Sequence, residues 1–362
     1  MKIAILARGL ARPGGVSRLT KGYVRALPEA APGDEFFILT DSPLDTAPRP
    51  NVTEVNLGKA HPALFDHYLV PRAAKRIGPD VLVATKNTVP RGLPCPCVCM
   101  FLDLAYFAMP EAYPALNNLY ARAMMRRSAK AAARIVAISR STREDIGRYL
   151  SKDAFEKTRV VYPGIDGAFR PFSDEERRSA AERFSGLPEW FALYAGNISP
   201  RKNIERLLEA FDGLDRDVAL VMTGHRSWKS DHLEPLFAKA RLKRRVMVLG
   251  PQSDEGVIAL YNLATASVYP SLYEGFGFPV LESFACGTPV VASNATSIPE
   301  VAGDAAMLVD PRDPKAIAEA LKAVLANDTL RAELRAKGLA RAAEFTWERS
   351  VGEMLAVIRE AA

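Results

Sequence analysis

The chain has 362 residues, of which 48% are hydrophobic, and it carries a formal net charge of +6. This length and apolar content exceed one ordinary domain core, so two globular domains are expected. No apolar run approaches the roughly 20 residues that span a bilayer, and the first residues turn polar too soon for a secretory signal, so we expect a cytoplasmic chain and not a periplasmic binding protein.

Short apolar runs alternate with amphipathic segments along the whole chain. The amphipathic stretches 17–27 and 203–211 have the pattern of helices. We therefore predict an α/β fold of two Rossmann-like, doubly wound domains that face a central cleft, with ligands at the carboxyl ends of the strands. The runs read as buried parallel strands are 2–7, 35–40, 80–85, 97–102, 134–139, 191–196, 219–224, 246–250, 266–270 and 289–293.

A glycine pair, Gly14 and Gly15, separates the first predicted strand from the first predicted helix. Glycines let backbone N–H groups approach a ligand closely, and a helix N-terminus favours an anion. The loop is neither a Walker loop nor a G-x-G-x-x-G fingerprint, so a nicotinamide cofactor is not indicated. The alternative interpretation is a plain flexible turn.

The first half is the basic one, with 24 Lys and Arg against 14 Asp and Glu in residues 1–165, compared with 24 against 28 in residues 166–362. Much of the excess lies in a helical stretch that is either a solvated face or a surface for anionic lipid or an anionic acceptor. Its basic residues are Arg122, Arg126, Arg127, Lys130 and Arg134.

Three cysteines alternate in the stretch "CPCVC" at the start of one predicted strand, where alternate residues share a face. Reduced thiols fit a cytoplasmic chain. A metal site is the alternative, although the spacing is not the usual zinc pattern. These residues are Cys95, Cys97 and Cys99.

Glycine and proline interrupt the pattern around 163–171, which predicts the domain joint. The expected domains are 1–165 and 166–345. The chain then ends in an amphipathic helix over 346–362.

Arg201 and Lys202 follow the strand that ends at Gly196 and lie beside the start of the next helix. Cations are unfavourable at the positive end of a helix dipole, and a bound phosphate would resolve that conflict. The alternative is two exposed loop cations. Further along, His225 is interpreted as a loop residue or a nucleotide contact, and the D-x-D string at 215–217 as a turn.

The stretch from Glu274 to Glu282, "EGFGFPVLE", places two carboxylates around a glycine loop and a proline that suits the first turn of a helix. Carboxylates accept hydrogen bonds from adjacent hydroxyls, which sugars supply in pairs. We interpret the stretch as holding a polyol at each end with a phosphate between them. The structural alternative is a solvated loop residue and a carboxylate that favours its own helix dipole.

This stretch resembles the E-x7-E motif of retaining glycosyltransferases of family 4, which have the GT-B fold. The segments "GGVSR", "ISRSTREDI", "GNISPRKN" and "TSIPEVAGDAAMLVDP" lie in the order typical of that family. The resemblance thus covers nearly the whole chain. It also implies that the last helix, from about Trp347, crosses back to the N-terminal domain.

The resemblance implies a role for each matching residue. Glu274 would contact the donor sugar, Glu282 the ribose hydroxyls, and Arg201 with Lys202 the diphosphate. Asp103 joins Glu274, Arg201 and Lys202 as a catalytic candidate. The acceptor would contact Lys86, Asn87 and Asp103. The complete donor-binding set is Gly14, Gly15, Ser139, Gly196, Arg201, Lys202, His225, Gly250, Glu274, Gly275, Phe276, Gly277, Phe278 and Glu282, with the base expected near 250–255 and Tyr261.

The chain departs from the family at one position. Many members carry a His-Asp pair after an N-domain strand, whereas Leu102 precedes Asp103 here. We expect an active enzyme, because the other motifs are intact. The alternatives are a silent nucleotide-sugar-binding subunit and a GT-B sugar-nucleotide epimerase.

The implied reaction is transfer of a hexose with retention of configuration, in which the departing diphosphate is stabilised by fixed positive charge and takes the acceptor proton. We expect no metal cofactor and no nucleic-acid partner. GDP-mannose is the first expectation for the donor, with UDP-hexoses and dTDP-rhamnose as alternatives. The acceptor is expected to be a glycan or lipid-linked glycan in bacterial surface polysaccharide or lipopolysaccharide synthesis, with peripheral contact at the inner membrane surface.

Overall fold

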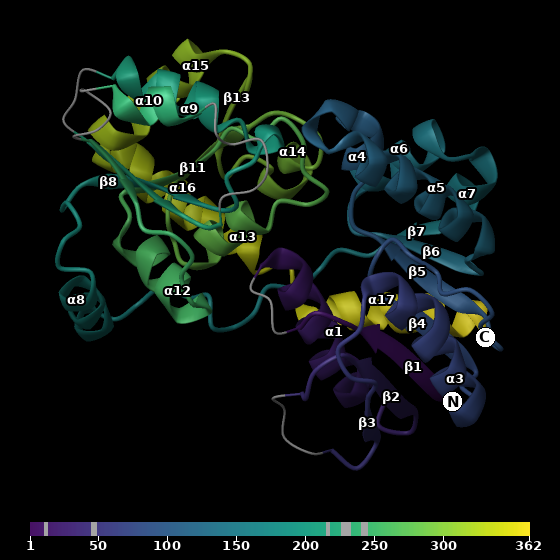
Figure 1. The fold of residues 1–362 in the computed structure, drawn as a ribbon. Helices are drawn as coiled ribbons and strands as arrows, with labels where there is room; N and C mark the ends of the chain where they lie inside the picture. Colours follow the sequence, from purple (N-terminus) through teal and green to yellow (C-terminus); the bar gives the residue numbers. More distant parts are fainter. Residues whose placement is uncertain (11–13, 45–48, 215–217, 226–232, 240–244) are drawn as a thin grey trace. The chain divides into compact units, whose positions relative to one another are not determined.

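The computed structural model describes residues 1–10, 14–44, 49–214, 218–225, 233–239 and 245–362. They form two compact units (Figure 1). Unit 1 comprises Met1–Pro110, Pro114–Gly164 and Phe345–Ala362, and unit 2 comprises Glu111–Tyr113 and Ile165–Glu344. The short segment Glu111–Tyr113, which the sequence assigned to the first domain, therefore belongs to unit 2.

Unit 1 is built on a seven-stranded sheet in the order β3-β2-β1-β4-β5-β6-β7, and every pair of neighbours is parallel. The order reverses direction between β1 and β4, as in a doubly wound sheet. The strands are β1 (Lys2–Ala7), β2 (Glu35–Thr40), β3 (Val52–Asn56), β4 (Val81–Ala84), β5 (Cys97–Phe101), β6 (Arg134–Ala137) and β7 (Thr158–Val160).

Helices connect these strands as right-twisted parallel sheets require. They are α1 (Gly15–Ala30), α2 (Pro62–Leu64), the π-helical turn η1 (Phe65–Leu69), α3 (Val70–Ile77), α4 (Ala105–Ala108), the 3₁₀ turn η2 (Pro110–Ala112), α5 (Ala115–Ala131), α6 (Arg140–Tyr149), α7 (Lys152–Glu156) and the C-terminal α17 (Trp347–Ala361).

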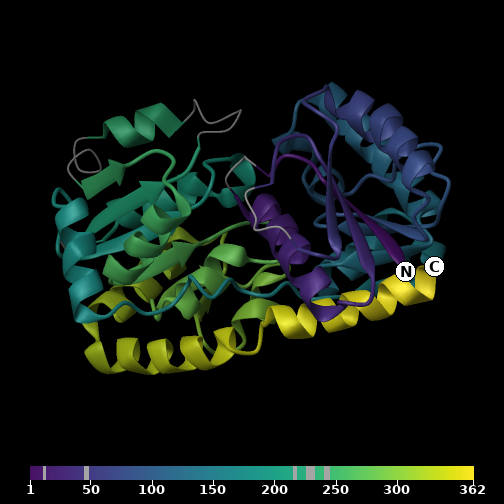
Figure 2. The ribbon, with the colours of Figure 1, turned by 90° about the horizontal axis from the view of Figure 1, so that it is seen from below.

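The last helix, α17, packs against α1 and against β4, β5 and β6 (Figure 2). Trp347 meets the Tyr23 ring edge to face, with centroids 5.1 Å apart. The Tyr23 hydroxyl and the Ser350 hydroxyl lie 2.9 Å apart in a buried hydrogen bond. Residues 345–362 thus complete the core of the unit that begins at Met1.

Unit 2 contains a six-stranded sheet in the order β10-β9-β8-β11-β12-β13, again with only parallel neighbours. Its direction reverses between β8 and β11. The strands are β8 (Phe191–Ala195), β9 (Ala219–Thr223), β10 (Val246–Val248), β11 (Ala266–Tyr269), β12 (Val290–Ser293) and β13 (Met307–Val309).

The helices of unit 2 follow the same alternation and lie on both faces of its sheet (Figure 1). They are α8 (Asp174–Arg183), the 3₁₀ turn η3 (Pro200–Lys202), α9 (Ile204–Asp212), α10 (Glu234–Ala238), α12 (Asp254–Leu263), α13 (Phe278–Ala285), α14 (Ile298–Ala302), α15 (Pro314–Ala326) and α16 (Asp328–Ala342).

The predicted α/β class and doubly wound sheets are confirmed. All ten predicted strands form, and apart from the half-exposed edge strand β10 they are mainly buried apolar runs, as parallel strands of a doubly wound sheet should be. The prediction missed β3, β7 and β13, which lie at sheet edges. β3 and β7 mix polar with apolar residues, and β13 is an apolar run of only three residues.

Candidate functional site

The carboxyl ends of β8 and β9 are joined to each other and to the residues that follow β10. The Gly196 amide donates to the Thr223 carbonyl at 2.9 Å, and the Ile198 amide donates to the His225 carbonyl at 2.9 Å. The Gly224 amide donates to the Gly250 carbonyl at 3.1 Å. The structure thus brings Gly196, His225 and Gly250 together, as expected for residues at one edge of a parallel sheet.

Gly224 is a residue that sequence reasoning missed at this edge. Its φ is 136°, and a Cβ placed there would lie 2.1 Å from the Gly196 carbonyl oxygen. Only glycine allows the two loops to approach this closely. A glycine at the end of a predicted buried strand was the available signal.

A buried charge cluster lies beside these loops. The Arg201 guanidinium donates to Glu274 Oε2 at 2.9 Å and to the Tyr273 carbonyl at 3.1 Å. The Lys202 ammonium donates to Glu274 Oε1. Lys202 and Glu274 are 7% and 9% exposed, so the pair is shielded from water. We call Arg201, Lys202 and Glu274 the charge cluster.

The strand order explains why residues 72 positions apart meet. β8 and β11 are neighbours in the sheet, so the loops after them leave from the same edge. The Leu272 amide donates to the Arg201 carbonyl at 2.8 Å and fixes the two loops to each other. Both cations lie in or at the end of η3, directly before α9.

Electrostatics keep Glu274 ionised. Burial raises the pKa of this carboxyl, but Lys202 and Arg201 outweigh burial and hold the pKa at about 2. At neutral pH Glu274 is therefore an acceptor of hydrogen bonds and does not donate a proton. Two cations and one carboxylate leave the charge cluster with a net positive charge.

Asn203 was also missed as a site residue, although it is part of the quoted motif. It has left-handed backbone geometry, with φ 61°, and it is buried. Its side-chain amide donates to the Pro270 carbonyl at 2.9 Å and to the Pro311 carbonyl at 2.6 Å. Asn203 thus ends the turn that carries the two cations and connects it to the loop after β11.

The loop from Glu274 to Phe278 is held by the residues before α14. The Glu274 amide donates to the Thr296 hydroxyl at 3.0 Å. The Ser297 hydroxyl donates to the carbonyls of Glu274 and Phe276 at 3.0 and 2.7 Å. Buried Gly275 and Gly277 continue the loop, and Gly277 precedes the first residue of α13. The rings of Phe276 and Phe278 pack edge to face, with centroids 5.1 Å apart.

Glu282 lies on α13 and is 2% exposed. Its Oε2 accepts a hydrogen bond from the Tyr261 hydroxyl at 3.0 Å. Tyr261, which the sequence placed near the nucleotide base, is itself 0% exposed. The two glutamates therefore belong to different hydrogen-bonded groups, one with cations and one with a phenol.

In unit 1, Gly14 precedes α1 with φ 131°, and Gly15 is the first residue of that helix. Ser139 is 0% exposed, and its hydroxyl accepts from the Thr142 amide at 3.0 Å as the N-cap of α6. Ser139 therefore has a capping role in this structure.

The three residues predicted to meet the acceptor bond to backbone groups. The Lys86 ammonium donates to the Arg8 carbonyl at 2.7 Å. The Asn87 side chain accepts from the Leu102 amide at 2.8 Å and donates to the Asp103 carbonyl at 3.3 Å. Asp103 Oδ1 accepts from the Ala105 amide at 3.1 Å, at the start of α4. The bonds of Asn87 and Asp103 fix the loop after β5, whereas the Lys86 bond connects the loop after β4 to the residue that follows β1.

Two other predictions concern metals. Cys95, Cys97 and Cys99 are free thiols, and burial raises the pKa of each. Among the described residues, no group of three or more His, Cys, Asp or Glu side chains could hold a metal ion. The D-x-D string at 215–217 lies outside the described residues.

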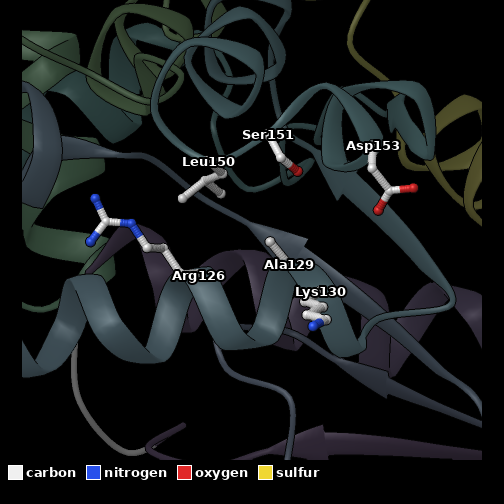
Figure 3. Close-up of a pocket in the computed structure, with 6 residues that line it drawn as sticks. All are labelled: Arg126, Ala129, Lys130, Leu150, Ser151 and Asp153. Atoms are coloured by element: carbon white, nitrogen blue, oxygen red, sulfur yellow. The ribbon is translucent and has the colours of Figure 1, made fainter.

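A hollow of about 320 Å³ lies between α5 and the turn that joins α6 to α7 (Figure 3). Its lining includes Arg126 and Lys130 of the basic stretch, together with Leu150 and Ser151. It contains none of the residues predicted for the donor or the acceptor. In the described ranges, no helix combines the length and the hydrophobicity that a bilayer span requires.

Two family models match the chain: "Glycosyltransferase Family 4" over residues 13–169 and "Glycosyl transferases group 1" over residues 176–341. The O-antigen chain mannosyltransferase B of Escherichia coli is 35% identical over 255 residues, which are 69% of this chain and 67% of that protein.

Among solved structures, the sucrose-phosphate synthase of Thermosynechococcus elongatus superimposes with a TM-score of 0.77 at 22% identity, over 99% of this chain and 98% of that one. HepE of Anabaena, solved in complex with UDP-glucose, has a TM-score of 0.75 at 18% identity, over 98% and 99% of the two chains. These similarities establish the GT-B fold.

Proposed function

This chain belongs to glycosyltransferase family 4, and from that premise we propose that it is a retaining mannosyltransferase that uses GDP-mannose. The similarity to an O-antigen chain mannosyltransferase supports both the sugar and a role in surface polysaccharide or lipopolysaccharide synthesis. A structural neighbour that holds UDP-glucose supports a nucleotide-sugar donor. UDP-hexoses and dTDP-rhamnose are the alternative donors.

The charge cluster is the observation that carries this proposal. Its net positive charge, at the carboxyl edge of the unit 2 sheet, suits the diphosphate of a nucleotide sugar. Burial lowers the local dielectric and strengthens each charge interaction. The principal barrier in this reaction is the negative charge that develops on the departing diphosphate. Arg201 and Lys202 would stabilise this charge.

Glu274 has a separate role in the proposal. Because its pKa is held at about 2, it stays charged and accepts hydrogen bonds from hydroxyls of the transferred sugar. It also orients Lys202. The proton of the acceptor hydroxyl then passes to the departing phosphate, so Glu274 need not act as a base. We further propose that the reaction needs no divalent metal, and chelation with EDTA should leave turnover unchanged.

The acceptor is proposed to be a lipid-linked glycan that meets unit 1 at a membrane surface. On α5, Leu116, Leu119 and Tyr120 are 82%, 69% and 56% exposed and share one helical face. The exposed residues Arg126 and Lys130 continue this face toward the hollow of Figure 3. This face of α5 is apolar in its first half and cationic in its second half, a combination that suits the interface of an anionic bilayer.

A vesicle assay tests this contact. The protein should sediment with vesicles that contain anionic lipid at low salt and should stay in solution with neutral vesicles. Replacing Leu116 and Leu119 by serine should abolish sedimentation while leaving donor hydrolysis unchanged. Equal sedimentation of the variant would contradict the assignment of α5.

The reaction is tested with a panel of GDP-, UDP-, dTDP- and ADP-sugars and a mixed lipid-linked acceptor fraction. Nucleoside diphosphate release and glycosylated product should come from GDP-mannose and disappear in Glu274→Ala. Arg170→Ala is the matched control, because it removes an exposed ion pair with Glu176 in the same unit. An α-linked product from the α-linked donor would establish retention.

Three other outcomes have distinct meanings. Isomerisation of the donor without acceptor would indicate an epimerase. Donor binding without turnover would indicate a silent subunit. Absence of donor binding would refute the proposal.

A further inference from the structure

Two buried tyrosines form a hydrogen-bonded chain that ends at Glu282. The Tyr269 hydroxyl donates to the Tyr261 hydroxyl at 3.1 Å, and the Tyr261 hydroxyl donates to Glu282 Oε2 at 3.0 Å. The exposed fractions of Tyr261, Tyr269 and Glu282 are 0%, 3% and 2%. Buried groups that are paired in this way hold one geometry, because water does not compete for them.

Each member of the chain comes from a different element. Tyr261 is on α12, Tyr269 is the last residue of β11, and Glu282 is on α13. The Tyr261 ring packs against Phe169, and the Tyr269 ring packs against Tyr194, so neither phenol can turn without disturbing the core. Burial raises the pKa of Tyr269, which keeps its hydroxyl protonated and able to donate.

This arrangement does more than stabilise the fold. A buried carboxylate stabilises a protein little, since desolvation opposes its hydrogen bonds. What the two phenols supply is direction: the Tyr261 hydroxyl holds Oε2 of Glu282, and Tyr269 holds the Tyr261 hydroxyl in place. A ligand that offers two adjacent hydroxyls needs an acceptor that is held in this way.

We propose that Tyr261, supported by Tyr269, is a positioning residue that orients Glu282 toward the ribose diol of the donor. The proposal rests on the proposed function, because the nucleotide sugar supplies the ribose. Tyr261 acts through Glu282 and does not itself contact the reacting atoms. Discrimination between ribose and 2′-deoxyribose should therefore depend on a hydroxyl that touches neither sugar.

The experiment measures dissociation constants of GDP, UDP and their 2′-deoxy counterparts by calorimetry. The proteins are the wild type, Tyr261→Phe, Tyr269→Phe and Glu282→Gln. Tyr23→Phe is the matched control: it removes an equally buried phenol hydrogen bond, to Ser350, in unit 1. Thermal unfolding identifies variants that fail to fold.

The wild type should bind its preferred nucleotide roughly tenfold more tightly than the 2′-deoxy form, the effect of one hydrogen bond to a charged group. This ratio should approach one in Tyr261→Phe and in Glu282→Gln. It should fall partly in Tyr269→Phe and stay at the wild-type value in Tyr23→Phe.

A wild-type ratio in folded Tyr261→Phe would overturn the positioning role while leaving the proposed function intact. An equal fall in Tyr23→Phe would attribute the effect to lost stability and would also overturn it. If the wild type bound no nucleoside diphosphate, the proposed function would fail and the positioning role with it. If Tyr261→Phe did not fold, the test would be Tyr269→Phe: a partial fall of its ribose-to-deoxyribose ratio would support the positioning role, and a wild-type ratio would overturn it.

Discussion

In each unit the candidate residues lie at the carboxyl edge of that unit's own parallel sheet, but their hydrogen-bond partners differ. In unit 2, the side chains of Arg201, Lys202 and Glu274 bond to one another through charge. In unit 1, Lys86 and Asn87 bond to backbone groups of neighbouring loops. Paired charges in a buried position can act on a substrate, whereas bonds to the backbone set the shape of a loop. Substitutions should therefore affect catalysis more in unit 2 than in unit 1.

The largest effect is expected for Lys202→Met. Losing a buried cation at the proposed diphosphate site should reduce kcat by roughly 10²- to 10³-fold. Steady-state release of nucleoside diphosphate measures this loss. Arg170→Met, which removes an exposed ion pair with Glu176 and a hydrogen bond to the Pro171 carbonyl, should keep wild-type turnover. Comparable losses in both variants would contradict a special role for the charge cluster.

The next largest effect is a difference in unfolding free energy between two glycine variants, one from each unit. Gly224 and Gly14 both have positive φ, 136° and 131°. In Gly224→Ala the new Cβ would meet the Gly196 carbonyl, whereas in Gly14→Ala it would meet nothing within 4 Å. Both variants carry a backbone cost of about 1–3 kcal/mol, and Gly224→Ala adds about 1–3 kcal/mol of overpacking.

Urea unfolding of both glycine variants measures the difference in free energy. Equal destabilisation would mean that the loops after β8 and β9 separate at no cost. The contrast between the crowded position of Gly224 in unit 2 and the open position of Gly14 in unit 1 would then be lost.

The pH dependence of the unfolding free energy tests whether the pKa of Glu274 is lowered in the folded chain. Its pKa is held at about 2 in the folded chain and is near 4.5 when unfolded. A depressed pKa stabilises the folded state above about pH 4.5, and this stabilisation is lost as the pH falls toward 2. The stability advantage of the wild type over Glu274→Gln should thus be constant near neutrality and shrink below about pH 4.5. Urea midpoints from about pH 7 to pH 3 measure it, and an advantage that grew in acid would contradict the sign.

The smallest effect is expected at Asp103. Asp103→Asn keeps an acceptor for the Ala105 amide, while Asp103→Ala loses it and should cost about 1 kcal/mol. If Asp103 only shapes its loop, Asp103→Asn should keep nearly full turnover. Loss of turnover in folded Asp103→Asn would give unit 1 a catalytic carboxylate and weaken the contrast between the units.

Much of the fold could be predicted because its signals are local. Buried strands such as 2–7 and 191–195 are short apolar runs, and Trp347 begins the last helix as expected. The edge strand β3 was missed, since an exposed edge needs no apolar pattern. Ser139, expected at a ligand, caps α6 in this structure, and its contact with a ligand stays a prediction.

The sequence by itself determined the alternation of strands and helices, the family, and the short stretch that carries Glu274 and Glu282. Only the tertiary structure decided the partners of these glutamates. Glu274 meets Lys202 because β8 lies beside β11, and Glu282 meets Tyr261 because α12 packs against α13. Periodicity depends on near neighbours in the chain. A pairing across 72 residues depends on strand order, which the packing of the whole unit sets.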